Sequence, residues 1–477
     1  MIRNVQVLDA DEIETVHSST LHILRKVGLR LRSDAHLTYL QKQGFDVDKK
    51  YFTVKMPESL VVEALNKAPK RFRLCSRDRK RDLQMGERNC YYATSGCASD
   101  VVDFETEARR PATLQDVVSC AKVIDAVENL DMIFSPISAH DVPSGTGVID
   151  EYKATVENST KHVHLVDLNS IYEAEYIIRI AGEIMGGVEN LIKEPIISDM
   201  YCSVSPLTMD ISALDTVLTF ARKGLPVSST SMPLAGGTAP MTPAGTLALS
   251  NAEVIGALVV MQAFCPNTPV IYTALPSIMD PRTGMYRAAA PEGIWMRMGV
   301  VQVAGYYKIP CMVGGVSSSS KTPNIQDGYE KALTAVLSRL AGADMLTGLG
   351  LLDSATALAL DQLVVDGEMC DHLVRALTDQ PIDDETLALD VIARVGPESH
   401  FISDKHTLKH ANDIWIPRLP GIDKISKSDP DNIVRNAKRR VRDILKNHKK
   451  QPLDLSIKKR IETIVTEARK NYQPPKT

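Results

Sequence analysis

Residues 311–333 read CMVGGVSSSSKTPNIQDGYEKAL. A short apolar run stops at two glycines, four serines follow, and after Pro323 the pattern becomes that of a helix. A buried run, a stretch of small residues and a helical stretch, in this order, form the unit from which parallel α/β folds are built. Ligands of such folds bind beyond the carboxyl ends of the strands, where the glycines and serines of this stretch fall.

The same unit recurs along most of the chain. The apolar or β-branched runs cover residues 91–95, 132–135, 162–166, 197–204, 227–232, 270–274, 311–316 and 345–348. Helical patterns between and after them include residues 113–128, 171–186, 213–223, 246–264, 291–307, 328–341 and 354–376. Eight strand–helix units predict the α/β class and a (β/α)8 TIM barrel, with the active site on the loops that follow the strands.

The two ends of the chain have other patterns. Residues 1–85 contain two amphipathic helical stretches and predict an α-rich N-terminal segment. The predicted barrel covers residues 86–395. The charged stretches DNIVRNAKRRVRDILKNHKK and DLSIKKRIETIVTEARKN follow it, so residues 396–477 predict a helical C-terminal extension. A separate Rossmann-type sheet is disfavoured, because no GxGxxG lies between a strand and a helix.

The overall composition is that of a soluble enzyme. The chain has 477 residues, of which 44% are hydrophobic and 24% charged, and its formal net charge is −4. This balance disfavours nucleic acid as a partner. We expect no membrane span, since no window of about 18 residues is uninterruptedly apolar, and no signal peptide, since the first residues turn acidic. Eight scattered cysteines without a CxxC pair indicate reduced thiols and a cytoplasmic location.

Small residues follow most of the predicted strands. Glycine pairs occur in residues 236–237 and 314–315, and a third glycine-rich stretch covers residues 348–350. Glycine lets a bulky planar partner approach the backbone closely, so these stretches favour a wide and shallow mouth. Ordinary tight turns between strand and helix remain the alternative explanation.

A metal site is the competing interpretation of the barrel. Lys161-His162-Val163-His164 places two imidazoles on one face of a strand, as in some barrel metallohydrolases. The later strand ends offer no further histidine, and His372 falls within a helical stretch. We therefore expect no protein-bound metal and interpret the two histidines as a pair satisfied by neighbouring hydrogen bonds. A metal-dependent barrel hydrolase stays the alternative enzyme.

Several segments together resemble the trimethylamine:corrinoid methyltransferases and their relatives. They are residues 27–31 (VGLRL), 103–106 (DFET), 109–113 (RRPAT), 279–284 (MDPRTG), 291–292 (PE), 320–321 (SK), 326–330 (QDGYE), 396–397 (GP), 400–401 (HF), 406–408 (HTL), and Trp415 with Pro417-Arg418. These segments run in order from one end of the chain to the other. The resemblance implies a TIM barrel that moves a methyl group from an amine to the cobalt of cobalamin, which a separate small corrinoid protein carries. It also implies a place in anaerobic one-carbon metabolism and a homo-oligomer.

One departure from that family points to the substrate. The archetype uses pyrrolysine, whereas this chain has only standard residues, with glycine and serine in residues 314–321, where we place the pyrrolysine position. Relatives without pyrrolysine include demethylases of quaternary amines such as glycine betaine, proline betaine and carnitine. The resemblance therefore implies a quaternary amine, glycine betaine first, with dimethylglycine as the product. A catalytically silent relative that only docks a corrinoid protein is the non-enzymatic alternative.

These expectations define three sets of candidate residues. A quaternary cation needs aromatic faces, and the candidates on predicted strands are Tyr91, Tyr92, Phe134, Tyr201 and Tyr272. A betaine carboxylate needs a cation or hydrogen-bond donor, for which the candidates are His140, His164, Arg282 and Arg287. The candidates for close approach of the corrin ring are Gly236, Gly237, Gly314, Gly315, Ser317, Ser318, Ser319, Ser320, Gly348 and Gly350. No acid or base is required, so we assign no catalytic residue.

Overall fold

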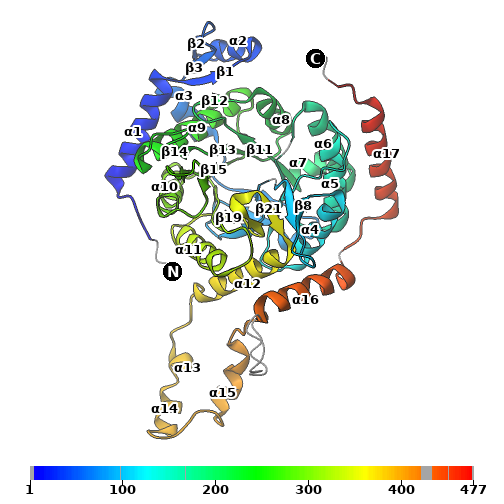
Figure 1. Ribbon diagram of the computed structural model, residues 1–477. Helices are drawn as coiled ribbons and strands as arrows, with labels where there is room; N and C mark the ends of the chain where they lie inside the picture. The colour runs from blue at the N-terminus through cyan, green and yellow to red at the C-terminus, as the bar shows by residue number, and fades with distance from the viewer. Residues whose placement is uncertain (1–4, 97, 167, 420–431, 450, 475–477) are drawn as a thin grey trace.

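A computed structural model describes residues 5–96, 98–166, 168–419, 432–449 and 451–474, and its centre is a closed barrel of eight parallel strands (Figure 1). The strands are β6 (Tyr91–Ala93), β9 (Met132–Phe134), β10 (His162–Leu165), β11 (Ile197–Cys202), β13 (Val227–Ser231), β15 (Val270–Ala274), β18 (Cys311–Val313) and β19 (Met345–Thr347). Each predicted run contains one of them, and β19 pairs with β6 to close the barrel. The predicted (β/α)8 fold is confirmed.

Helices cover the outside of the barrel. They are α4 (Leu114–Ala126), α5 (Gly147–Asn158), α6 (Ile171–Met185), α7 (Val188–Lys193), α8 (Ile211–Arg222), α9 (Pro243–Phe264), α10 (Pro291–Tyr307), α11 (Ile325–Leu340) and α12 (Leu360–Ala376). The sequence predictions missed α5, which fills the connection from β9 to β10. Its segment GVIDEYKATVEN carries charges in every turn, so its apolar face is hard to recognise.

The N-terminal segment packs against the barrel instead of standing apart. It contains α1 (Ala10–Lys26), α2 (Asp34–Lys42) and α3 (Glu58–Lys67) with short strands β1 (Leu29–Leu31), β2 (Asp46–Asp48) and β3 (Thr53–Lys55). Strand β1 also pairs with β12 (Thr208–Met209), which follows β11. Gly256 of α9 allows α1 and β1 to pack closely on α9, because a Cβ there would lie 2.6 Å from Leu29 and 2.9 Å from Leu24.

A hairpin closes the amino-terminal end of the barrel, which we call the floor. Strands β4 (Phe72–Leu74) and β5 (Leu83–Met85) form this hairpin, and a short 3-10 helix, η1 (Arg79–Arg81), connects them. Leu74, Leu83 and Met85 pack in one cluster with inward-facing residues of the barrel strands. Because the floor is filled, a substrate has to enter from the opposite end, the mouth.

Two small sheets lie over the mouth. The first has β14 (Leu234–Ala235), β16 (Ser277–Met279) and β17 (Tyr286–Arg287); the second has β7 (Asp100–Val102), β8 (Arg109–Pro111), β20 (Leu351–Leu352) and β21 (Ala357–Ala359). A 3-10 helix, η2 (Asp353–Ala355), connects β20 and β21. Strands of two or three residues leave no readable periodicity, so the sequence did not predict these sheets.

Helix α9 is long and apolar. Helix α9 has 22 residues and is apolar enough to cross a membrane, but 83% of its most apolar window is buried inside the protein. Such burial is typical of a core helix that is hydrophobic all round. Its contacts with α1, α3, α10 and the barrel strands place it in the helical layer.

The chain leaves the barrel after α12 and returns by a separate route. Residues 377–418, which we call the arm, carry α13 (Asp384–Leu387), α14 (Leu389–Val395), α15 (Lys405–His410) and the 3-10 helix η3 (Ala411–Asp413), and they project away from the barrel (Figure 1). The predicted boundary at residue 395 falls inside this arm. Helices α16 (Asn432–Asn447) and α17 (Leu455–Asn471) then pack on α12, α4 and α6.

Candidate functional site

The interior of the barrel carries a continuous chain of polar side chains. His162 Nε2 lies 2.8 Å from Ser198 Oγ, and the same hydroxyl lies 2.7 Å from His164 Nδ1. His164 Nε2 continues the chain to Ser228 Oγ at 3.1 Å, and Ser228 contacts Thr230 at 3.4 Å. The chain therefore runs from the filled floor toward the mouth, and both imidazoles use both ring nitrogens.

The two histidines are neutral at pH 7. Burial lowers the pKa of His162 to about 4, although the carbonyl oxygens of Cys75 and Pro195 partly offset it. Burial also lowers the pKa of His164 to about 3, and proximity to His162 adds to the effect. The interpretation of the pair as hydrogen-bonded strand residues fits these contacts. A neutral imidazole does not repel a bound cation.

The predicted aromatic residues separate into two groups. Phe134 faces the barrel interior, with its ring centroid 4.6 Å from that of His164 in an edge-to-face arrangement. Tyr91 also packs against the interior cluster, but its hydroxyl accepts hydrogen bonds from Gln84 N and Asn89 Nδ2 at the floor end.

The other three tyrosines point into the helical layer. Tyr92 accepts a hydrogen bond from Arg339 of α11 at 2.6 Å, and Tyr272 donates one to Asn251 of α9 at 2.8 Å. Tyr201 alternates with the inward-facing Met200 and is fully buried in the outer core. Side chains alternate along a strand, so residues on the outer face cannot reach a ligand in the mouth. Only Phe134 of the five lies inside the barrel toward its mouth.

The predicted carboxylate-binding residues are not brought together. His164 is enclosed in the interior chain. His140 Nε2 lies 3.1 Å from the carbonyl oxygen of Ser99, which directly precedes β7. Arg282 and Arg287 both bind Asp280, at 3.1 Å and 2.6 Å. The hydrogen bonds from these two arginines hold the pKa of Asp280 well below its usual range. Asp280 therefore binds Nε and Nη2 of both arginines within their own loop, and the Arg282 side chain stays 81% exposed.

Another arginine, Arg297, is buried and only partly satisfied. It is 1% exposed on the second turn of α10, and its Nη2 donates to Ala288 O. Its Nε and Nη1 make no hydrogen bond of good geometry, and the side chain close enough to interact with the guanidinium is that of Tyr286. Ala288 N in turn donates to Ser319 Oγ at 3.2 Å, so Arg297 lies beside the loop that follows β18. Burial lowers the pKa of this guanidinium, and the neighbouring Tyr286 side chain offsets part of the effect.

The serines after β18 are held by internal hydrogen bonds. Glu330 of α11 accepts from Ser318 Oγ at 2.9 Å and from Ser319 N at 2.8 Å. Ser317 Oγ donates to Gly314 O, and Ser320 Oγ donates to Thr322 O. These contacts make the run an ordered turn on Glu330, as the tight-turn explanation expects.

Several of the predicted glycines serve the packing of the barrel itself. A Cβ on Gly315 would lie 2.6 Å from Leu346, and one on Gly314 would lie 2.6 Å from Leu275. Gly348 has a φ of +117°, and a Cβ there would lie 2.2 Å from Val316 O. Gly350 likewise has positive φ and abuts Leu363. Gly236 and Gly237 are exposed beyond β14, where a ligand could approach their backbone, although Gly236 also has positive φ and a Cβ there would meet Met241.

Comparison with protein families identifies the relatives of this chain. A family model for trimethylamine methyltransferase (MTTB) matches residues 1–473. The chain belongs to this methyltransferase family. The resemblance seen in the sequence is thereby confirmed over almost the whole chain.

Individual relatives and a solved structure agree with this assignment. A trimethylamine methyltransferase of Desulfitobacterium hafniense is 30% identical, covering 97% of this chain and 94% of the relative. A glycine betaine methyltransferase of the same species is 28% identical, covering 88% and 87%. The crystal structure of the Methanosarcina barkeri monomethylamine methyltransferase superposes with a TM-score of 0.55 at 12% identity, covering 98% of this chain and 89% of that one. The last likeness concerns the fold alone.

Three residues at the mouth end of the barrel were not among the sequence-predicted candidates. Arg297 is one, and a signal existed, because after Glu292 it is the only charged residue in the apolar helix α10. Thr273 is another: it alternates with the outward Tyr272, and its buried hydroxyl has no hydrogen-bond partner. Tyr286, beside Arg297, is the third. Nothing in the sequence distinguishes Thr273 or Tyr286 from ordinary strand residues.

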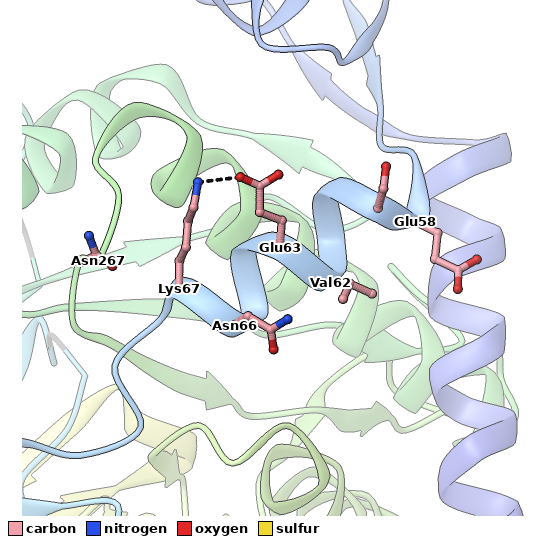
Figure 2. A pocket seen from close by; sticks show the side chains of 7 residues that line it. Glu58, Val62, Glu63, Asn66, Lys67 and Asn267 are labelled. Carbon is pink, nitrogen blue, oxygen red and sulfur yellow. Dashed lines mark hydrogen bonds and ion pairs between the residues drawn. The ribbon is translucent and has the colours of Figure 1, made fainter.

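A hollow elsewhere on the molecule does not belong to this site. It has a volume of about 880 Å³ and lies on α3 near Asn267, which precedes β15 at the floor end (Figure 2). Two of its three charged residues, Glu63 and Lys67, pair with each other at 2.5 Å and remain well exposed. Exposed pairs of this kind are common on helix surfaces, so the hollow offers no argument for chemistry.

Proposed function

We propose that this protein transfers a methyl group from a quaternary amine, glycine betaine first, to cobalt(I) of cobalamin carried by a separate small corrinoid protein. The tertiary amine, dimethylglycine, is the other product. Membership of the methyltransferase family supports the reaction type, and the glycine betaine methyltransferase among the relatives supports the substrate class. The observation that carries the choice of substrate is the half-satisfied guanidinium of Arg297.

A buried guanidinium whose Nε and Nη1 lack well-formed hydrogen bonds calls for an anion. Burying a charge without a partner is costly, and buried charges in proteins are therefore paired. Glycine betaine supplies a carboxylate, which an arginine can bind through two parallel hydrogen bonds. Trimethylamine has no such group and would leave Arg297 unpaired. We therefore assign Arg297, in place of Arg282 and Arg287, as the carboxylate-binding residue.

The cationic end of the substrate needs a different environment. Phe134 presents an aromatic ring inside the barrel, and the neutral His164 beside it adds no like charge. Tyr286, next to Arg297, supplies a second aromatic side chain on the side of β15 and β18. Aromatic faces attract quaternary ammonium groups through their quadrupole. Phe134 and Tyr286 are thus the proposed cation-binding residues, and Thr273 of β15 is proposed as a further lining residue.

The proposed reaction needs no acid or base from the protein. When the N–CH3 bond breaks, its electron pair stays on nitrogen, so the leaving group departs as a neutral amine without a proton donor. Cobalt(I) on the partner protein supplies the electron pair for the new bond to carbon. The task of this chain is then to align the amine with the acceptor and to exclude water. Neutral histidines and internally bonded serines are compatible with that task.

The methyl acceptor has to approach from the mouth. Of the residues predicted for the corrin ring, the exposed pair Gly236 and Gly237 can be approached directly, whereas Gly314, Gly315, Gly348 and Gly350 are packed within the barrel. We therefore place the approach of the corrin ring over the sheet that begins with β14. The serines 317–320 are proposed to shape that edge through Glu330.

The decisive experiment follows the visible spectrum of free cob(I)alamin under anaerobic conditions. The purified protein is mixed with cob(I)alamin and glycine betaine, proline betaine, carnitine, choline or trimethylamine in turn. We expect methylcobalamin and dimethylglycine from glycine betaine, and no reaction with trimethylamine. Turnover of trimethylamine at a comparable rate, or equal use of choline, would contradict the proposed substrate.

Two other functions predict other outcomes of the same experiment. A catalytically silent docking protein would bind a corrinoid protein and give no spectral change with any amine. A metal-dependent hydrolase would need metal bound in the barrel, where His162 and His164 are instead hydrogen-bonded to Ser198 and Ser228. Zinc bound in proportion to the protein and lost on mutation of His162 would favour that hydrolase.

A further inference from the structure

The arm has no core of its own. Between Cys370 and Leu419 the structure describes every residue, and none of them is buried. Large apolar side chains in the arm are exposed, among them Ile382 at 84% and Ile402 at 77%. Isolated helices of four to seven residues do not persist in water, and a segment without a core usually needs a disulfide, a metal or a partner to hold it.

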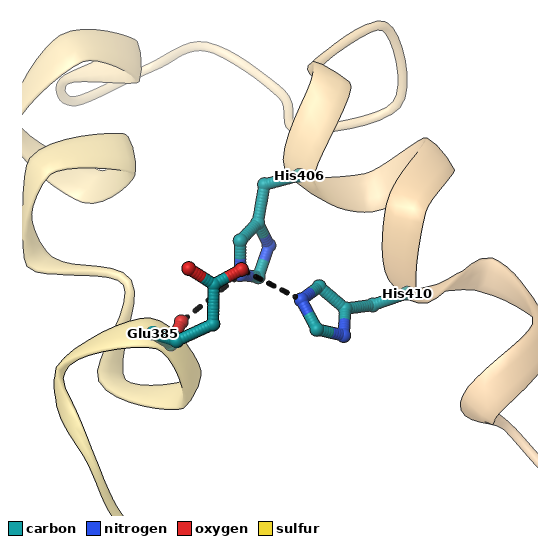
Figure 3. A group of neighbouring side chains, drawn as sticks. All are labelled: Glu385, His406 and His410. Carbon is teal, nitrogen blue, oxygen red and sulfur yellow. Dashed lines mark hydrogen bonds and ion pairs between the residues drawn. The ribbon is translucent and has the colours of Figure 1, made fainter.

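Two polar contacts join the outgoing and returning limbs of the arm. One is the ion pair of Arg394 and Asp404 at 2.8 Å, which joins α14 to the start of α15. The other is a cluster of Glu385 with His406 and His410, which we call the arm cluster. Glu385 comes from α13, whereas both histidines come from one face of α15 (Figure 3).

The geometry of the arm cluster is that of a potential metal site. One ligand atom from each residue lies within 4.8 Å of the other two. His410 Nε2 is 3.2 Å from Glu385 Oε1, and the two imidazole centroids are 4.4 Å apart. Ligand atoms on one tetrahedral zinc lie roughly 3.4 Å apart, given bonds of about 2.0–2.1 Å. Small rotations of the exposed Glu385 side chain and of the partly buried imidazoles close that difference.

A fourth residue, Asp413, orients one of the imidazoles. Its Oδ2 lies 2.7 Å from His410 Nδ1, on the ring nitrogen opposite the one that faces Glu385. Metal-bound histidines commonly donate their second ring N–H to a carboxylate in this way. Lys409 also binds Glu385, so a metal would have to compete with this exposed ammonium group.

We propose that Glu385, His406 and His410 bind a zinc ion that cross-links the two limbs of the arm. Two imidazoles and one carboxylate suit Zn²⁺, with water in the fourth position. The i, i+4 spacing of the histidines on α15 places both rings on one side. The zinc ion closes the loop from residue 385 to residue 406 and replaces the missing core of the arm. This site is separate from the barrel mouth and independent of the methyl transfer proposed above.

The test is a zinc titration of the full-length protein after treatment with a chelator. We expect the parent protein to bind one equivalent of Zn²⁺, and His406→Ala and His410→Ala each to lose it. His400→Ala is the matched control, because His400 is an exposed histidine of the same arm outside the cluster. Asp413→Asn should keep the site but weaken its affinity by about 10- to 100-fold, as removal of an orienting carboxylate does.

A second measurement reads the cross-link itself. Limited proteolysis of the arm should slow when zinc is added to the parent protein or to His400→Ala, and should not respond to zinc in His406→Ala. Thermal unfolding of the barrel, measured on the same variants, verifies that they are folded. The absence of a stoichiometric zinc ion in the parent protein overturns the proposal. So does zinc retained by a His406→Ala/His410→Ala double variant, or lost equally from the His400→Ala control.

Discussion

Two ionic clusters in this molecule use similar groups in opposite surroundings. Beneath the mouth, Lys331 lies between Asp366 at 2.8 Å and Asp327 at 3.4 Å, and all three side chains are at most 2% exposed. In the arm, Glu385 binds Lys409 and His410, and the side chains of Glu385 and Lys409 are more than half exposed. The first cluster connects parts of a closed core, whereas the second joins limbs that have none.

The difference shows what each cluster can do for the protein. Asp366 also accepts hydrogen bonds from Gly350 N and Gln362 Nε2, both at 2.7 Å, so the buried cluster fixes the loop after β19. Burial raises the pKa of Asp327 to about 7, and Lys331 only partly offsets this. Solvent screens the arm cluster, so its ion pairs add little stability. A bound ion or a partner has to supply the stability that the arm lacks.

The largest expected effect comes from breaking the buried cluster. Lys331→Met removes the cation that pairs with two buried carboxylates and should cost about 3–5 kcal/mol of unfolding free energy, as the loss of one partner from a buried pair does. The measurement is urea-induced unfolding at pH 7.5. A cost below about 1 kcal/mol would mean that water reaches this cluster and that the contrast between the two clusters is mistaken.

The next effect distinguishes a functional charge from a structural one. Arg297→Met removes a buried guanidinium whose Nε and Nη1 lack well-formed hydrogen bonds, so the unfolding free energy should stay level or rise. Betaine affinity should fall by about 1.5–3 kcal/mol, or roughly ten- to hundredfold, because a charged hydrogen-bond partner of the carboxylate is lost. Isothermal titration with glycine betaine and with choline provides the measurement. Unchanged betaine affinity, or an equal loss for choline, would place the carboxylate elsewhere.

Much of the barrel could be predicted from the sequence because each strand is buried on both faces and bounded by small residues. The run at 270–274 coincides with β15, and the stretch at 291–307 coincides with α10. Helix α5 escaped prediction because its charges hide the buried face. The sheets over the mouth escaped because β14 and β17 have two residues each, fewer than any periodicity can use.

The candidate site could be predicted only in part, since a one-residue step on a strand reverses the direction of the side chain. Phe134 faces inward and Tyr92 outward, although both are aromatic residues on predicted strands. Asp280 forms ion pairs with Arg282 and Arg287, a contact within one loop that spacing alone does not show. Arg297 escaped prediction because it lies on a helix of the outer layer, where the sequence pattern does not show which side chain turns toward the loop after β18. These differences between the predicted and the observed site arise from tertiary packing.

A smaller effect is expected from the interior histidines, through pH. Unfolded imidazole has a pKa of about 6.5, and burial lowers that of His164 to about 3. Below pH 6.5 the unfolded state therefore binds more protons, so the contribution of His164 is complete above that pH and is lost as the pH falls. The slope is about 1.4 kcal/mol per pH unit. His164→Gln should flatten the stability curve between pH 6 and pH 4 by that amount. An unchanged slope would mean that His164 is hydrated in the folded barrel.

The smallest effect on stability is expected in the arm, from Lys409→Met. This is the matched counterpart of Lys331→Met, and it should leave the unfolding midpoint of the barrel unchanged because the lysine is exposed.

The effect of Lys409→Met on zinc affinity should have the opposite sign to that of a ligand mutation. Lys409 competes for the Glu385 carboxylate, so its removal should tighten Zn²⁺ binding. If the cluster is only a set of ion pairs that binds no metal, the same change would only weaken the contacts of Glu385. Zinc titration of Lys409→Met beside the parent protein decides between them. Weaker zinc binding in this variant would show that the ammonium group supports the cluster, and would contradict the idea that Glu385 is free to ligate the ion.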